Sequence, residues 1–152
     1  MTSGPERTLL AVLRDELGVT GPKFGCGEAR CAACVVQLGD QVVPACRTSL
    51  REVAGQPITT VEGLARDGRL HPVQQAWLEV GAMQCGFCTP GWLVETAALL
   101  GQDPRPGEAE ILGSLERHVC RCCTYPRIRR AVLRAIELAE HPEAGLPAEA
   151  SG

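Results

Sequence analysis

The chain has 152 residues, which is enough for one ordinary domain or two small ones. Its net charge of −3 at pH 7 argues against a nucleic-acid-binding protein, which would carry a basic face. Only 3% of its residues are aromatic, and small domains with such light cores usually depend on metals or cross-links, so the nine cysteines are the feature to explain first.

The first half of the chain predicts one helix followed by short strands. Residues 8–17 should form a helix because their leucines recur at helical spacing and share one apolar face. These are Leu9, Leu10, Leu13 and Leu17. A glycine-rich loop, two strands joined by a Gly39-Asp40 turn and a third short strand should follow, at 21–30, 34–38, 41–43 and 58–61. Residues 63–70 have the composition of a linker.

In the second half the apolar period changes from two to about 3.6 residues, which predicts helices. Four are expected: one from Pro72, one over 89–101 with Thr89 as N-cap and Pro90 at its first position, one after Pro106, and one over 126–140. The Pro/Gly/Ala-rich tail over 141–152 should be disordered or lie on a partner. The sequence therefore predicts an α+β protein, with a β-rich half followed by an all-α half.

The first group of cysteines has the pattern Cys26-x4-Cys31-x2-Cys34, and Cys46 follows beyond the first hairpin. This is the spacing of plant-type [2Fe–2S] proteins. Gly25 and Gly27 would let the loop curl so that its amides approach the sulfur atoms. A zinc site is the alternative, but zinc favours two Cys-x2–4-Cys pairs, and three cysteines on one loop fit that pattern poorly.

The second group pairs Cys85-x2-Cys88 with Cys120-x-Cys122. Each pair precedes an expected helix, and the positive end of a helix favours thiolates and anionic clusters. Alone, this group also fits a thioredoxin-like redox pair or half of a zinc site. Beside the ferredoxin-like first group, it favours a second iron–sulfur cluster.

We do not expect the ninth cysteine or the three histidines to be metal ligands. Cys123 directly follows Cys122, and because adjacent residues rarely reach the same iron, we expect a spare thiol packed beside the cluster. For His71, His118 and His141 we expect surface positions or positions around the cluster ligands. The arginine-rich stretch 117–134 suits a solvated helix face, and docking onto an acidic or phosphate-bearing partner is the alternative.

Compartment follows from the absence of recognisable targeting signals. The first residues lack a basic segment followed by a long apolar core, so no signal peptide is expected, and no apolar run is long enough to span a membrane. Cysteines in such a chain indicate reduced thiols and metal rather than disulfides. The expected location is cytoplasmic, or periplasmic by co-export with a partner.

Several sequence segments together resemble the small subunits of the xanthine dehydrogenase and aldehyde oxidase family of molybdenum hydroxylases. The similarity runs from about Leu9 to Ala139, and its ending is most similar to the small subunits of the isoquinoline oxidoreductase type. The segments that carry it are KFGCGEARCAACVV, VPACRTSL, ITTVEGL, QCGFCTPG and VCRCCTYPRIRRAV.

The resemblance implies a β-grasp ferredoxin-like domain over 1–66 and a four-helix [2Fe–2S] domain over 67–140. The outer cluster would be held by Cys26, Cys31, Cys34 and Cys46. The inner cluster would be held by Cys85, Cys88, Cys120 and Cys122, with Gln84 and the Cys120 region against the molybdopterin of a large partner subunit. A cytochrome c-type or FAD-binding subunit would accept the electrons.

Two features depart from the family. Members usually begin with a strand hairpin before the first helix, whereas here about eight residues precede Leu9, so the true start lies upstream or a partner covers the exposed sheet edge. Members commonly have Gly or Thr at the position of Cys123.

No hydroxylase activity is expected from this chain alone. A free-standing ferredoxin and a zinc-stapled interaction module are the alternative functions.

Overall fold

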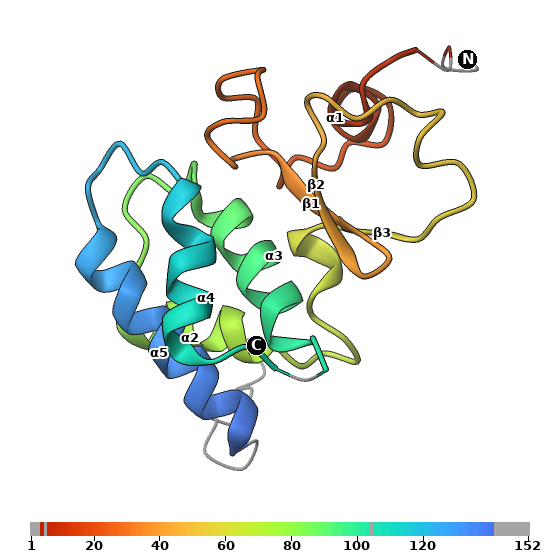
Figure 1. Cartoon of the computed structure of the whole chain (residues 1–152). Helices are drawn as coiled ribbons and strands as arrows, with labels where there is room; N and C mark the ends of the chain where they lie inside the picture. The colour runs from red at the N-terminus through yellow and green to blue at the C-terminus, as the bar shows by residue number, and fades with distance from the viewer. Residues whose placement is uncertain (1–3, 5, 104, 142–152) are drawn as a thin grey trace.

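A computed structural model describes Gly4, residues 6–103 and residues 105–141. Apart from His141, the tail expected at 141–152 lies outside this part of the chain. Figure 1 shows a small sheet and a short helix in the first half, and a group of helices in the second. The helices are α1 (Leu9–Ala11), α2 (Pro72–Val80), α3 (Thr89–Leu100), α4 (Glu108–Ser114) and α5 (Tyr125–Glu140), and the strands are β1 (Val35–Leu38), β2 (Gln41–Pro44) and β3 (Ile58–Thr59).

The sheet is antiparallel, with β1 between β2 and β3. Gly39 adopts a positive φ of 57° in the β1–β2 turn, a conformation that glycine takes without strain. Neighbouring residues of β1 point to opposite faces, and both faces are covered: Val35 packs in a core with the helices, whereas Val36 packs in a second core with α1. The central strand is therefore shared by both halves of the molecule.

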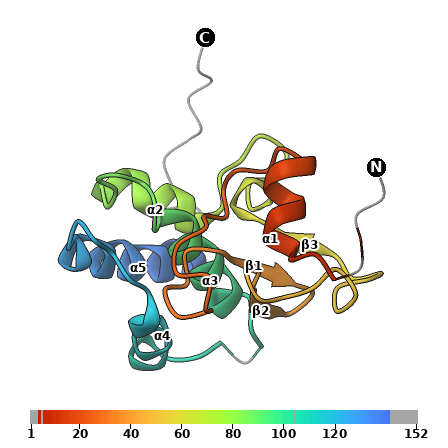
Figure 2. The same ribbon diagram turned by 90° about the horizontal axis from the view of Figure 1, so that it is seen from above.

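The helical half is built around the pairing of α2 with α5, while α3 contacts both β1 and α5. Both ribbon views place α3 between the sheet and α5 (Figures 1 and 2). The apolar side chains that recur at helical spacing in the sequence are buried where these helices pack together. The largest side chains of this core that are almost inaccessible include Trp77, Ile111, Leu115, Ile128, Val73, Val94 and Val132.

Two expected details of the helices are wrong. Leu17 is 64% exposed instead of sharing the apolar face of the first helix. The reason is that α1 continues as a π-helical turn over Val12–Glu16, which takes more residues per turn and rotates Leu17 outward. Thr89 is the first residue of α3 and is itself buried; Cys88 occupies the N-cap position.

Helix α2 begins with a reciprocal cap that invites a stability test. His71 Nδ1 accepts a hydrogen bond from Val73 N (3.3 Å), and Gln74 Oε1 accepts one from His71 N (2.9 Å). We expect His71→Ala to lower the free energy of unfolding by about 1 kcal/mol, whereas His71→Asn should retain most of it because asparagine also caps. Chemical denaturation of the two variants in parallel measures the difference, and equal losses would contradict the role of the cap.

The same cap predicts a pH dependence. Burial, together with the nearby Arg66 charge, lowers the pKa of His71, so its imidazole stays neutral and Nδ1 remains free to accept. Since the unfolded chain binds this proton more readily, the contribution of His71 should be lost as the pH falls below about 6.5, the ordinary histidine pKa. Denaturation at pH 5 and pH 7.5 should show a smaller decrease in His71→Asn.

Candidate metal centres

The loop of the first cysteine group directs backbone amides at its sulfur atoms. Cys26 Sγ accepts hydrogen bonds from the amides of Arg30 (3.2 Å) and Glu28 (3.4 Å), and Cys31 Sγ accepts one from Cys26 N (3.4 Å). The bond from Glu28, helped by those from Arg30 and Cys31, lowers the pKa of Cys26 to about 7. The loop thus favours thiolates before any metal is considered.

Glycine is required next to this site for reasons of space. A Cβ added to Gly25 would lie 2.8 Å from Cys31 Sγ, and 3.8 Å from the ring of Phe87, which belongs to the second cysteine group's loop. Gly27 adopts a positive φ of 69°, and Ala29 and Ala32 adopt the same left-handed region. The tight curl expected from the glycines is therefore present.

The other two thiols of the first group lie deeper. Cys34 and Cys46 are both buried. Burial raises the pKa of Cys34 to about 12, and the Cys46 and Cys31 side chains also interact with it. The first group thus consists of a more exposed pair, Cys26 and Cys31, and a buried pair, Cys34 and Cys46.

The second group has the same organisation. The thiol of Cys85 interacts with that of Cys122, and the thiol of Cys88 with that of Cys120, strongly enough to shift the pKa values of Cys85 and Cys88. The Phe87 amide, with Cys122, lowers the pKa of the exposed Cys85, whereas burial raises the pKa of Cys88 to about 12. Burial alone would raise the pKa of Cys120 too, but hydrogen bonds from Thr124 hold it below its ordinary value. Its Sγ lies 3.3 Å from Thr124 Oγ1.

The arrangement of the thiols in pairs shows whether each cysteine group better fits a single metal ion or a two-iron cluster. Within residues 6–103 and 105–141, no three His, Cys, Asp or Glu side chains converge as ligands of a single ion. Each group instead contains two pairs of cysteines, and the two thiols within each pair interact with one another. A [2Fe–2S] cluster has two irons and takes two thiolates on each, so both groups fit a dinuclear cluster.

Cys123 differs from the other eight cysteines. Its Sγ lies 3.8 Å from the Arg121 carbonyl, and its backbone is left-handed with a φ of 55°. In the described part of the chain, the interactions that connect the thiols of the second group involve Cys122 and not Cys123. Gln84, expected at the pterin, is exposed directly before Cys85.

A buried polar network beside the second group was not expected from the sequence. Glu95 on α3 is only 7% exposed and accepts hydrogen bonds from Arg117 (2.6 and 3.1 Å), and His118 Nε2 lies 2.7 Å from it. Burial would raise the pKa of Glu95, but these partners outweigh burial and lower it. His118 is 2% exposed, so of its two expected positions, at the surface or around the cluster ligands, the structure rules out the first. The one available signal was a charged residue within the apolar segment WLVETAALL.

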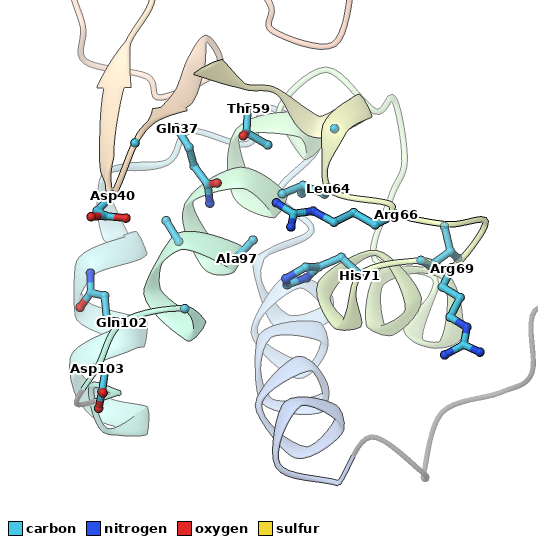
Figure 3. Close-up of a pocket in the computed structure, with 15 residues that line it drawn as sticks. Gln37, Asp40, Thr59, Leu64, Arg66, Arg69, His71, Ala97, Gln102 and Asp103 are labelled. Carbon is cyan, nitrogen blue, oxygen red and sulfur yellow. The ribbon is translucent and has the colours of Figure 1, made fainter. Parts of the chain in front are cut away.

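A hollow lies away from both cysteine groups. It has a volume of about 970 Å³ and is lined by residues from the end of the sheet, the segment before α2 and the end of α3 (Figure 3). Gln37, Arg66, His71 and Gln102 are among these residues, and no cysteine is.

The described residues contain no helix that is long and apolar enough to cross a membrane.

A small sheet joined to helices, with two groups of paired thiols, defines an iron–sulfur protein. Comparison with known families agrees. Residues 2–65 match the model of the "2Fe-2S iron-sulfur cluster binding domain", and residues 60–133 match that of the "[2Fe-2S] binding domain".

Whole-chain relatives give the family. The chain is 42% identical to the alpha subunit of isoquinoline 1-oxidoreductase from Brevundimonas diminuta, covering 89% of each. It is 40% identical to the small FeS subunit of nicotinate dehydrogenase from Eubacterium barkeri, over 88% of this chain and 85% of the relative. The crystal structure of quinoline 2-oxidoreductase from Pseudomonas putida 86 superposes with a TM-score of 0.81 at 31% identity, over 93% of this chain and 88% of that one. The chain belongs to the family of small iron–sulfur subunits of molybdenum hydroxylases.

Proposed function

We propose that the chain is the electron-transfer subunit of a heteromeric molybdenum hydroxylase. It would relay electrons from a molybdopterin centre in a large partner subunit, through two [2Fe–2S] clusters, to a cytochrome or FAD-containing acceptor. The observation that carries this proposal is the arrangement of eight cysteines in two groups, each made of two interacting pairs. The catalytic chemistry would belong to the partner.

The pairs of thiols support the two ligand sets that the family resemblance implies. Cys26 with Cys31, and Cys34 with Cys46, would hold the two irons of the outer cluster, and the second group would hold the inner cluster. In that group Cys85 pairs with Cys122, and Cys88 with Cys120. When bound, each cluster accepts one electron, so two in series divide a two-electron oxidation into single steps. The amides on Cys26 and Cys31 would stabilise the anionic sulfur atoms.

Exposed apolar side chains support the docking of the partner near the second group. Met83, Phe87, Val119 and Tyr125 are each more than 40% exposed, and all lie within a few residues of its cysteines. Such a collection is unusual on a free surface. Gln84 and the Cys120 region would lie against the pterin at this interface.

The proposed domains are a β-grasp ferredoxin-like unit over 1–66 and a four-helix unit over 67–140, followed by a tail over 141–152. The described sheet supports the first only in part, since it has three strands and an outer edge on β3. The compartment, cytoplasm or periplasm by co-export, would be that of the partner.

Metal analysis with EPR of the anaerobically purified, dithionite-reduced chain tests the proposal. We expect about four irons and four acid-labile sulfides per chain and two distinct S = 1/2 signals. Zinc in place of iron in a fully loaded preparation would instead indicate a structural module. One cluster alone would indicate a simple ferredoxin and contradict the assignment of the helical half.

A further inference from the structure

The two cysteine groups are in direct contact through the backbone. The Val119 amide donates a hydrogen bond to the Cys31 carbonyl with an N···O distance of 3.3 Å. Cys31 is a ligand candidate of the first group, and Val119 directly precedes Cys120 of the second. This hydrogen bond therefore completes a route of covalent bonds and one hydrogen bond from one thiol group to the other.

The contact is embedded in a close approach of the first loop to α3. A Cβ on Gly91 would lie 2.1 Å from the Ala32 carbonyl oxygen, so the peptide between Ala32 and Ala33 rests directly on the first turn of α3. The same turn follows Cys88. The first loop is thus fixed on one side, and the position of Val119 decides whether the hydrogen bond forms.

Val119 is held by the residues immediately before it. Arg117 and His118 both bind the Glu95 carboxylate on α3, and the His118 ring stacks on Trp92 with a centroid distance of 4.6 Å. Tyr125 Oη accepts a hydrogen bond from Cys120 N at 2.7 Å, which fixes the chain on the other side of Val119. The segment 117–120 is therefore tied to α3 and α5 at both ends.

A buried carboxylate is a poor source of stability, because the cost of removing it from water offsets most of the gain from its ion pairs. Such groups are more useful for selecting one geometry among several. Glu95 stands in an otherwise apolar stretch of α3, and its carboxylate binds the two residues that precede Val119. This placement suits a role in positioning.

We propose, on the basis of the two-cluster function above, that Glu95 is a positioning residue: through Arg117 and His118 it holds the Val119 amide on the Cys31 carbonyl and so sets the electronic coupling between the two clusters. A continuous path of covalent bonds and hydrogen bonds transmits electronic coupling better than a through-space jump of the same length. Loss of the hydrogen bond should weaken the coupling while both sets of four thiols remain in place.

The first test removes the hydrogen bond itself. Val119→Pro deletes the amide N–H, and the extended backbone of His118 (φ −73°, ψ 126°) is what a residue before proline requires. Val119→Ala removes the exposed side chain but keeps the amide, so it is the matched control. In the fully reduced chain we expect a through-bond exchange contribution to the magnetic splitting of the two EPR signals in the wild type and in Val119→Ala. In Val119→Pro this contribution should be lost, so that the splitting falls to the through-space dipolar part.

The second test addresses Glu95. Glu95→Ala should reduce the splitting and make the Val119 amide exchange with solvent about tenfold faster or more, measured by mass spectrometry on a peptide containing it. Leu100→Ala, a core truncation at the other end of α3, controls for general destabilisation and should change neither readout. Unchanged splitting in Glu95→Ala, or no splitting in the wild type, would overturn the proposal.

Iron content separates this inference from the proposed function. Four irons and two signals in every variant, with unchanged splitting, would leave the relay intact and reject the role of Glu95. Fewer than four irons in the wild type would count against the relay itself. If Val119→Pro does not retain its iron, the comparison of Glu95→Ala with Leu100→Ala decides the question.

Discussion

Replacing Gly91 with alanine should destabilise the protein by about 2 kcal/mol or more, although alanine is the better helix former by about 1 kcal/mol. The added Cβ would lie 2.1 Å from the Ala32 carbonyl oxygen and 3.1 Å from its carbon. Both are backbone atoms of the first cysteine loop, so they cannot move without displacing Cys31. Thermal unfolding followed by circular dichroism should show a lowered midpoint, and the visible absorption of the outer cluster should be lost first.

Gly113→Ala is the matched control. Gly113 lies in α4, and nothing outside its own helix turn lies within 4 Å of an added Cβ. Here only helix propensity acts, so we expect stabilisation by about 0.5–1 kcal/mol. If the two substitutions shift the unfolding midpoint in the same direction, the close approach of the first loop to α3 is wrong.

Single cysteine substitutions should remove one cluster and leave the other. Cys34→Ser eliminates a buried ligand of the first group, and Cys88→Ser a buried ligand of the second. The Cys88 side chain makes no capping hydrogen bond to α3, so the helix itself should persist when the thiol is replaced. We expect iron to fall from about four to about two per chain in each variant, with loss of a different EPR signal.

Cys122 and Cys123 provide the sharpest comparison, since they are neighbours and chemically identical. Cys122→Ser should lose the second cluster, whereas Cys123→Ser should retain four irons, because the thiol interactions with Cys85 involve Cys122. The reverse result would reassign the ligand. Far-ultraviolet circular dichroism of both variants distinguishes a missing ligand from an unfolded chain.

Local patterns in the sequence were sufficient for most of the fold. The sequence predicted the start of α2 at Pro72 and both ends of α5 to within one residue, and the Gly39-Asp40 turn predicted the first hairpin. Cysteine spacing predicted both groups of thiols. These features depend on residues close together in the chain, where periodicity and turn preferences act directly.

Features that depend on distant residues were missed. Glu95 and His118 lie 23 positions apart in the chain, so no local pattern could indicate their pairing. Leu17 was misplaced because nothing in the leucine spacing indicates a π-helical turn. The need for glycine at position 91 arises from Ala32, on a loop far away in sequence, and it becomes visible only when both are placed in space.

The central strand has a consequence for how the molecule melts. Val35 lies in the core with the helices and Val36 in the core with α1, so opening either half uncovers one side of the same strand. Without the first half, the core of the helices lacks Ala32, Val35 and Leu64; without the helices, the first half exposes the Val35 face of β1. Heat or denaturant should therefore unfold the cluster-free chain in a single cooperative transition, and a chain cut between residues 66 and 67 should need both pieces present to acquire ordered structure.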